Sequence, residues 1–181
     1  MKVLILQASR NGGNTEKIAD QFILGAKEAG HEVEKISLFT KKMNGCLGCE
    51  YCRNHDGICV WKDDLVEVNQ KILESNVIVM VSAIYFYGIS AQLKMVIDRT
   101  FNIEHSIHDK KIYFITSSAA PDEPSQMSRL QYAINSVQGW VDCLRNNCEL
   151  VKVFGGWGMW QEPDVTKKKA YIEAYEEGKN L

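Results

Sequence analysis

Five apolar stretches along the chain have the length of β-strands and are separated by segments with helical spacing. They lie at residues 3–6, 32–37, 77–82, 112–116 and 150–154. The first, third and fourth are almost continuously apolar, which is typical of parallel strands covered on both faces. The second alternates apolar and charged residues, as expected of a strand at a sheet edge. The pattern therefore predicts a mostly buried parallel sheet.

Between the strands, apolar residues recur at the spacing of amphipathic helices. The stripes comprise Ile18, Ala19, Phe22, Ile23 and Ala26; Leu65, Val68, Ile72 and Leu73; Leu93, Val96 and Ile97; and Met127, Leu130, Ile134, Val137 and Val141. Asp63 or Asp64 is expected to cap the second helix, and a polar helix is expected after Pro163. The alternation predicts one α/β domain over residues 1–181, with a doubly wound five-stranded sheet in the flavodoxin-like order 2-1-3-4-5. Ligands of such sheets bind beyond the carboxyl ends of the strands.

The loop after the first strand has the composition of a phosphate-binding turn. It reads Ser9-Arg10-Asn11-Gly12-Gly13-Asn14-Thr15 and opens a helix. Its glycines let several N–H groups point inward, the helix N-terminus adds partial positive charge, and Arg10 supplies a full one. The spacing matches neither a dinucleotide fingerprint nor a Walker A loop. An ordinary turn with Asn14 or Thr15 as the helix cap is the alternative.

The loop after the third strand is aromatic and ends in glycine. It reads Ala83-Ile84-Tyr85-Phe86-Tyr87-Gly88. Flat rings and free amides at the end of a strand suit a planar heteroaromatic ligand. The alternative is that Tyr85 and Phe86 pack into the core. If both loops follow neighbouring strands, they meet at the same crevice.

Four cysteines fall within one short segment at residues 43–62. Cys46, Cys49, Cys52 and Cys59 give the spacing C-x2-C-x2-C-x6-C. Four thiolates so close together suit a tetrahedral metal site or a [4Fe–4S] cluster. Metal-free thiols and an adventitious zinc site remain alternatives. Cys143 and Cys148, by contrast, are interpreted as unpaired thiols.

These motifs resemble the NAD(P)H-dependent FMN reductase family, and particularly its iron–sulfur flavoprotein branch. The first loop resembles the family's S-x-R-x-x-G-N-T phosphate site, the aromatic loop its P-x-Y-F/W segment, and residues 92–99 its Q-L-K-x-x-I-D-R helix. The resemblance extends to about residue 118. The chain departs from the family's motifs at two positions. Ala8 replaces the usual serine, so Ser9 must supply that hydroxyl. Ala83 replaces the usual proline.

The resemblance implies which residues hold the cofactor. Arg10, Asn11, Asn14 and Thr15, with Ser9, are expected to bind the FMN phosphate, and residues 83–87 (Ala83, Ile84, Tyr85, Phe86 and Tyr87) to line the isoalloxazine ring. By their position after the fourth strand, Ser117 and Ser118 are expected to face its pyrimidine side. The four clustered cysteines would hold a [4Fe–4S] cluster, and no acid–base residue is needed for catalysis.

The function that follows is an NAD(P)H-dependent flavin oxidoreductase acting on a quinone, flavin or similar acceptor. The alternative is an iron–sulfur flavoprotein that carries electrons between ferredoxin-like donors and an acceptor, or a redox sensor. The formal net charge of −2 gives no attraction to nucleic acid or anionic membranes. No apolar run is long enough for a membrane span, so we expect a cytoplasmic protein. A flavin at the mouth of a crevice favours a homodimer or homotetramer.

Overall fold

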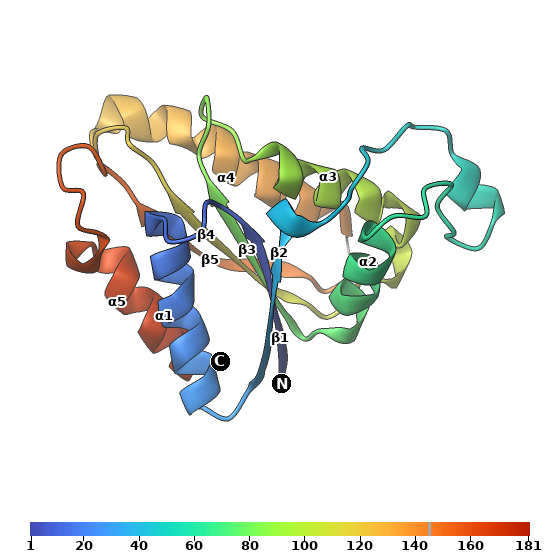
Figure 1. The fold of residues 1–181 in the computed structure, drawn as a ribbon, viewed down its shortest axis with the longest axis horizontal. Helices are drawn as coiled ribbons and strands as arrows, with labels where there is room; N and C mark the ends of the chain where they lie inside the picture. The colour runs from blue at the N-terminus through green and yellow to red at the C-terminus, as the bar shows by residue number, and fades with distance from the viewer. Residues whose placement is uncertain (145) are drawn as a thin grey trace.

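The computed structural model describes residues 1–144 and 146–181. Within that part of the chain, five parallel strands form one sheet in the order β2-β1-β3-β4-β5 (Figure 1). The strands are β1 Lys2–Ala8, β2 Glu32–Ser37, β3 Val77–Ala83, β4 Lys111–Ser117 and β5 Glu149–Gly156. The flavodoxin-like order expected from the sequence is therefore confirmed, with β2 at an edge as predicted.

Helices cover both faces of the sheet. They are α1 Asn14–Glu28, α2 Leu65–Glu74, α3 Ala91–Arg99, α4 Pro124–Leu144 and α5 Lys169–Lys179. α1 and α5 cover one face, where Phe22 packs near the rings of Tyr113 and Phe154. α2, α3 and α4 cover the other face, in a core that includes Leu6 and Phe114. Because strand residues alternate between the two faces, each strand contributes to both cores.

Two helix predictions are refined by the structure. Asp63, not Asp64, accepts a hydrogen bond from the Leu65 N–H at the start of α2 (3.2 Å), while the Asp64 carboxylate accepts from the Lys42 N–H (2.8 Å). The C-terminal helix expected to be polar is amphipathic, because Ala170, Ala174 and Gly178 are buried. Its small residues allow α5 to pack closely on α1.

One segment leaves the body of the fold. Between β2 and α2 the chain extends away from the sheet on the side of α2 and returns (Figure 1). This excursion, residues 41–62, contains the four clustered cysteines and a short 3₁₀ turn at Tyr51–Asn54. Among the described helices, none combines the length and apolarity needed to cross a membrane.

Candidate flavin site

A cavity of about 230 Å³ lies beyond the carboxyl ends of β1, β3 and β4. This is the switch point at which ligands of doubly wound sheets bind. The loops after β1 and β3 meet there, as expected from the sequence. Its lining residues are Ser9, Arg10, Gly13, Asn14, Thr15, Ala83, Ile84, Tyr85, Ser117, Ser118, Ala119 and Met159.

The turn after β1 holds its shape through a glycine. The Gly13 N–H donates to the Arg10 carbonyl (3.0 Å), and a Cβ at Gly13 would lie only 2.9 Å from that oxygen. Gly13 is also the N-cap of α1, and within the described chain no side chain caps the helix there. Asn14 and Thr15 are already helical, so the ordinary turn in which one of them serves as cap is wrong.

The open amides at the start of α1 suit an anion, because the first N–H groups of a helix have no partner within it. In the turn just before the helix, the Gly12 N–H is already occupied, since it donates to the Glu16 carboxylate. Glu16 is paired with Lys35 (2.7 Å). Burial raises the pKa of Glu16, but hydrogen bonds from Lys35 and Gly12 outweigh it and keep that pKa below its ordinary value. Lys35 thus offsets the negative charge that Glu16 brings to this turn.

Hydroxyl groups connect the walls of the cavity. Thr15 Oγ1 lies 2.6 Å from Ser117 Oγ, so a buried hydrogen bond joins the start of α1 to the end of β4. Ser9 Oγ lies 2.6 Å from the side-chain nitrogen of Gln7. Ser9, Thr15, Ser117 and Ser118 are all buried. The cavity floor is therefore polar and built from several strands, which suits a phosphate and a heteroaromatic edge.

The aromatic loop forms a tight turn at the cavity mouth. Tyr85 and Gly88 exchange two backbone hydrogen bonds, of 3.0 and 2.8 Å. Phe86 and Tyr87 between them both have positive φ, 49° and 61°. Phe86 is fully exposed and Tyr85 is about half exposed. The alternative in which Tyr85 and Phe86 pack into the core is therefore wrong.

Three residues expected at the site lie outside the cavity lining. Asn11 and Phe86 are exposed beside it. Tyr87 is turned toward α4, where its hydroxyl donates to Gln126 Oε1 (2.8 Å) and Arg129 lies over its ring. Gly13, Ala119 and Met159 line the cavity without having been singled out. Met159 follows a glycine-rich segment at residues 155–158, at the end of β5, and that segment is the sequence signal that could have indicated its place.

The excursion at residues 41–62, called the cysteine segment below, is more open to solvent than the cavity floor. Cys46 and Cys49 are exposed, while Cys52 and Cys59 are partly buried. Across the described residues, no three His, Cys, Asp or Glu side chains are grouped closely enough to hold one metal ion. Cysteine thiolates are nevertheless the ligands that iron–sulfur clusters use. The Gly48 N–H already donates to Cys46 Sγ (3.4 Å).

The base of this segment is anchored in the body of the protein. Arg99, the last residue of α3, makes two hydrogen bonds with the Asp63 carboxylate (2.9 and 3.1 Å) and one with the Asn44 carbonyl (2.8 Å). Burial raises the pKa of Asp63, but the hydrogen bonds from Arg99 and Asn44 outweigh it and hold the pKa below its ordinary value. Arg99 therefore has a structural role, since it binds residues near both ends of the segment.

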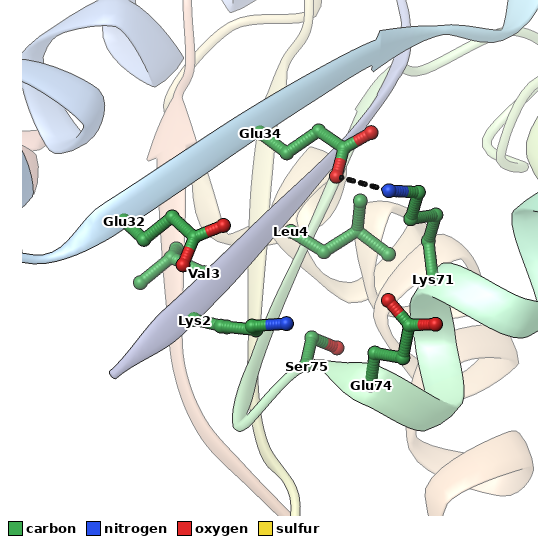
Figure 2. A pocket seen from close by; sticks show the side chains of 8 residues that line it. All are labelled: Lys2, Val3, Leu4, Glu32, Glu34, Lys71, Glu74 and Ser75. Carbon is green, nitrogen blue, oxygen red and sulfur yellow. Dashed lines mark ion pairs between the residues drawn. The ribbon is translucent and has the colours of Figure 1, made fainter.

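A second cavity lies at the opposite end of the sheet and is too small for a cofactor. It holds about 40 Å³ between the start of β1, β2 and the end of α2. Figure 2 shows its charged lining, in which Lys71 pairs with Glu34 (3.1 Å). That volume accommodates roughly one water molecule. Two further cavities, of about 320 and 310 Å³, lie beside the segment that holds the four clustered cysteines. The cavity beyond the carboxyl ends is therefore the candidate site because of its place in the fold and not because of its volume.

Comparisons with known proteins bear on the family and the fold of the chain. The family model for NADPH-dependent FMN reductase matches residues 1–159. An iron-sulfur flavoprotein of Methanocaldococcus jannaschii is 41% identical over 101 residues, which are 55% of this chain and 52% of the relative. The chain thus matches about half the length of such curated relatives.

Solved structures show the same fold at low sequence identity. The NAD(P)H:quinone oxidoreductase of Methanothermobacter marburgensis has a TM-score of 0.78 at 19% identity, covering 100% of this chain and 96% of the other. An FMN-dependent NADH-azoreductase of Bacillus anthracis, solved in complex with FMN, has a TM-score of 0.75 at 16% identity, covering 99% and 98%. With the match of the family model over most of its length, this chain belongs to the NADPH-dependent FMN reductase family.

Proposed function

We propose that the chain binds FMN in the cavity beyond β1, β3 and β4 and acts as an NAD(P)H-dependent oxidoreductase. The observation that carries this proposal is the meeting of the glycine turn and the aromatic loop at one polar cavity. Residues 1–181 would work as a single FMN-binding domain, with the cysteine-rich loop at residues 43–62. Bound FMN would supply two-electron chemistry between a nicotinamide and an acceptor.

The residues present fit the phosphate end of FMN. Uncapped amides at the start of α1 and the Arg10 guanidinium would bind the phosphate. Ser9, Asn14 and Thr15 would add side-chain donors. One buried hydroxyl oxygen near the end of β4, Thr116 Oγ1, has no hydrogen-bond partner among the described residues. Thr116 does not line the cavity, however, so the fit to FMN rests on the helix amides, Arg10 and the side-chain donors.

The ring end would lie against residues 83–87, with Ser117 and Ser118 on its pyrimidine side. Ala83, Ile84 and Tyr85 line the cavity directly, whereas Phe86 and Tyr87 border it. Backbone amides here would stabilise negative charge on the ring. The exposed Phe86 would then meet the acceptor or a second subunit. We propose a homodimer or larger assembly whose contact uses this loop and residues 41–61.

The binding proposal is tested with apoprotein titrated by FMN and by riboflavin. Arg10→Gln removes the cation at the cavity, and Lys17→Gln removes an exposed cation of α1 that does not line it. Loss of a charge-assisted contact is expected to weaken FMN binding roughly 10- to 100-fold. Riboflavin, which lacks the phosphate, should bind Arg10→Gln as it binds the wild type, and Lys17→Gln should resemble the wild type with both ligands.

The activity is tested by following NADPH and NADH oxidation with a quinone, free flavin or azo dye as acceptor. Sustained turnover supports the oxidoreductase. Slow reduction by NAD(P)H with fast electron exchange with a ferredoxin supports a carrier. Wild-type apoprotein that fails to bind FMN would overturn both. We also propose a cytoplasmic location, where the six cysteines would stay thiols or metal ligands.

The second candidate function, an iron–sulfur electron carrier, is favoured by the four clustered cysteines and the likeness to iron-sulfur flavoproteins. Anaerobically purified protein should then contain about four irons per chain and show a broad visible shoulder beside the flavin bands. Cys49→Ser should abolish the iron, whereas Cys143→Ser, outside the segment, should keep it. Flavin bands without iron in the anaerobic wild type would exclude this candidate.

A further inference from the structure

Gln7 is an unusual residue for its place in the fold. It is the next-to-last residue of β1, between Leu6 and Ala8, and it is completely buried. Its side chain lies on the face of the sheet that carries Val3 and Ile5 and that α1 covers. Burying an amide costs free energy unless its polar atoms find partners. An apolar residue would be the ordinary choice at this position.

The Gln7 amide is directed at Ser9. Its nitrogen lies 2.6 Å from Ser9 Oγ and 3.3 Å from the Ser9 carbonyl oxygen. A carbonyl oxygen accepts hydrogen bonds and does not donate them, so the nitrogen side of the amide must face Ser9. The Ser9 hydroxyl then accepts from Gln7. Its own hydrogen is left free to donate elsewhere.

Ser9 is buried and lines the cavity proposed for FMN. Ala8, which stands where the family motif has serine, offers no hydroxyl there. A serine hydroxyl that already accepts one hydrogen bond is oriented before a ligand arrives, which lowers the cost of binding. The amide is also neutral, so it adds no negative charge beside a phosphate.

From this geometry we propose that Gln7 is a positioning residue that holds the Ser9 hydroxyl as a donor to the FMN phosphate. The inference rests on the proposed function. It adds to the proposed role of Ser9 a partner, Gln7, that fixes the direction of the Ser9 hydroxyl. Gln7 itself does not line the cavity and acts through Ser9.

The test measures dissociation constants of FMN and riboflavin for apoprotein variants by quenching of flavin fluorescence. Gln7→Met keeps the length of the side chain but removes the donor, and should weaken FMN binding roughly tenfold while leaving riboflavin binding unchanged. Ser9→Ala should have a similar, phosphate-dependent effect. The double variant should bind FMN no more weakly than Ser9→Ala, because both changes remove the same contact.

Gln7→Glu adds a readout that a merely structural role would not show. An ionised carboxylate would accept the Ser9 hydrogen and repel the phosphate, so FMN binding should fall further, by roughly 100-fold. Protonating that carboxyl restores a donor. FMN affinity of Gln7→Glu should therefore recover as the pH falls, relative to the wild type, whereas riboflavin affinity should follow the wild type throughout.

Three results would overturn the inference. In the first, Gln7→Met binds FMN like the wild type; in the second, it loses FMN and riboflavin affinity equally; in the third, its effect on FMN affinity adds fully to that of Ser9→Ala. If Gln7→Met does not fold, the test uses Ser9→Ala, which removes only one oxygen. Unchanged FMN affinity of Ser9→Ala would by itself overturn the inference. All of these presuppose wild-type FMN binding, so they are distinct from failure of the proposed function.

Discussion

The cavity at the ends of the strands and the cysteine segment both stand out in the sequence, but the fold supports them in different ways. The cavity is assembled from residues that directly follow β1, β3 and β4, and its hydroxyls are buried. The cysteine segment extends away from the sheet (Figure 1). Two of its four thiols are exposed. A sheet fixes the first site through its core, whereas side-chain contacts at the base hold the second.

Those base contacts form two groups. In one, Arg99 binds the Asp63 carboxylate and the Asn44 carbonyl, which closes the segment near both of its ends. In the other, Asn102 Nδ2 donates to the Gly57 carbonyl (2.7 Å) and its Oδ1 accepts from Asn69 Nδ2 (2.9 Å). The comparison therefore predicts that removing these groups loosens the cysteine segment without altering the cavity.

The largest effect is expected from Asp63→Ala. The Asp63 and Arg99 side chains are 7% and 2% exposed, so the change leaves a buried guanidinium without its partner. Breaking such a pair from one side costs about 3–5 kcal/mol of unfolding free energy, measurable by urea denaturation. Glu67→Ala is the control, since it breaks an exposed pair with Lys41 worth less than about 1 kcal/mol.

Acid titration gives an independent check on Asp63. Because its pKa is lower in the folded protein than its ordinary value of 3.8, its contribution to stability is complete above that value. The contribution disappears as the pH falls through the lower folded pKa. Wild-type stability should therefore fall more steeply than that of Asp63→Ala below about pH 4. Parallel acid profiles would show that Asp63 is not held by Arg99 in solution.

A smaller effect is expected from Asn102→Ala, which removes the second group of contacts. Losing these hydrogen bonds, with Asn69 left partly unpaired, should lower the unfolding free energy by about 1–3 kcal/mol. Limited proteolysis should show faster cleavage within residues 44–62, because the segment opens more often. FMN affinity should stay within about twofold of the wild type. A large loss of FMN affinity would mean that the two regions are coupled, contrary to the comparison.

The sequence predicted the strands, their order and the meeting of the two loops, because buried parallel strands leave a strong apolar pattern. Gly13 and Thr15 fell within a turn whose glycines and polar residues before a helix are typical of phosphate binding. Gln7 escaped notice although it is only two residues from Ser9, because its role depends on where the two side chains lie and not on residue type or spacing. Tyr87 was placed at the cavity, but its hydrogen bond with Gln126 turns it toward α4. Contacts between distant residues leave no local pattern.

Backbone conformation in the aromatic loop is another feature that the sequence conceals, and it yields the smallest predicted effect. Phe86 has φ of 49° although its side chain is fully exposed. Left-handed backbone costs a non-glycine residue about 1 kcal/mol. Phe86→Gly should therefore stabilise the apoprotein by about 0.5–1 kcal/mol, whereas Phe86→Ala, which keeps a Cβ, should leave stability nearly unchanged. Equal effects of the two changes on stability would show that the turn carries no strain. The expected difference would show that backbone strain lies at the cavity mouth, where the Phe86 ring is exposed to solvent. The core that forms the sheet would then not be its source.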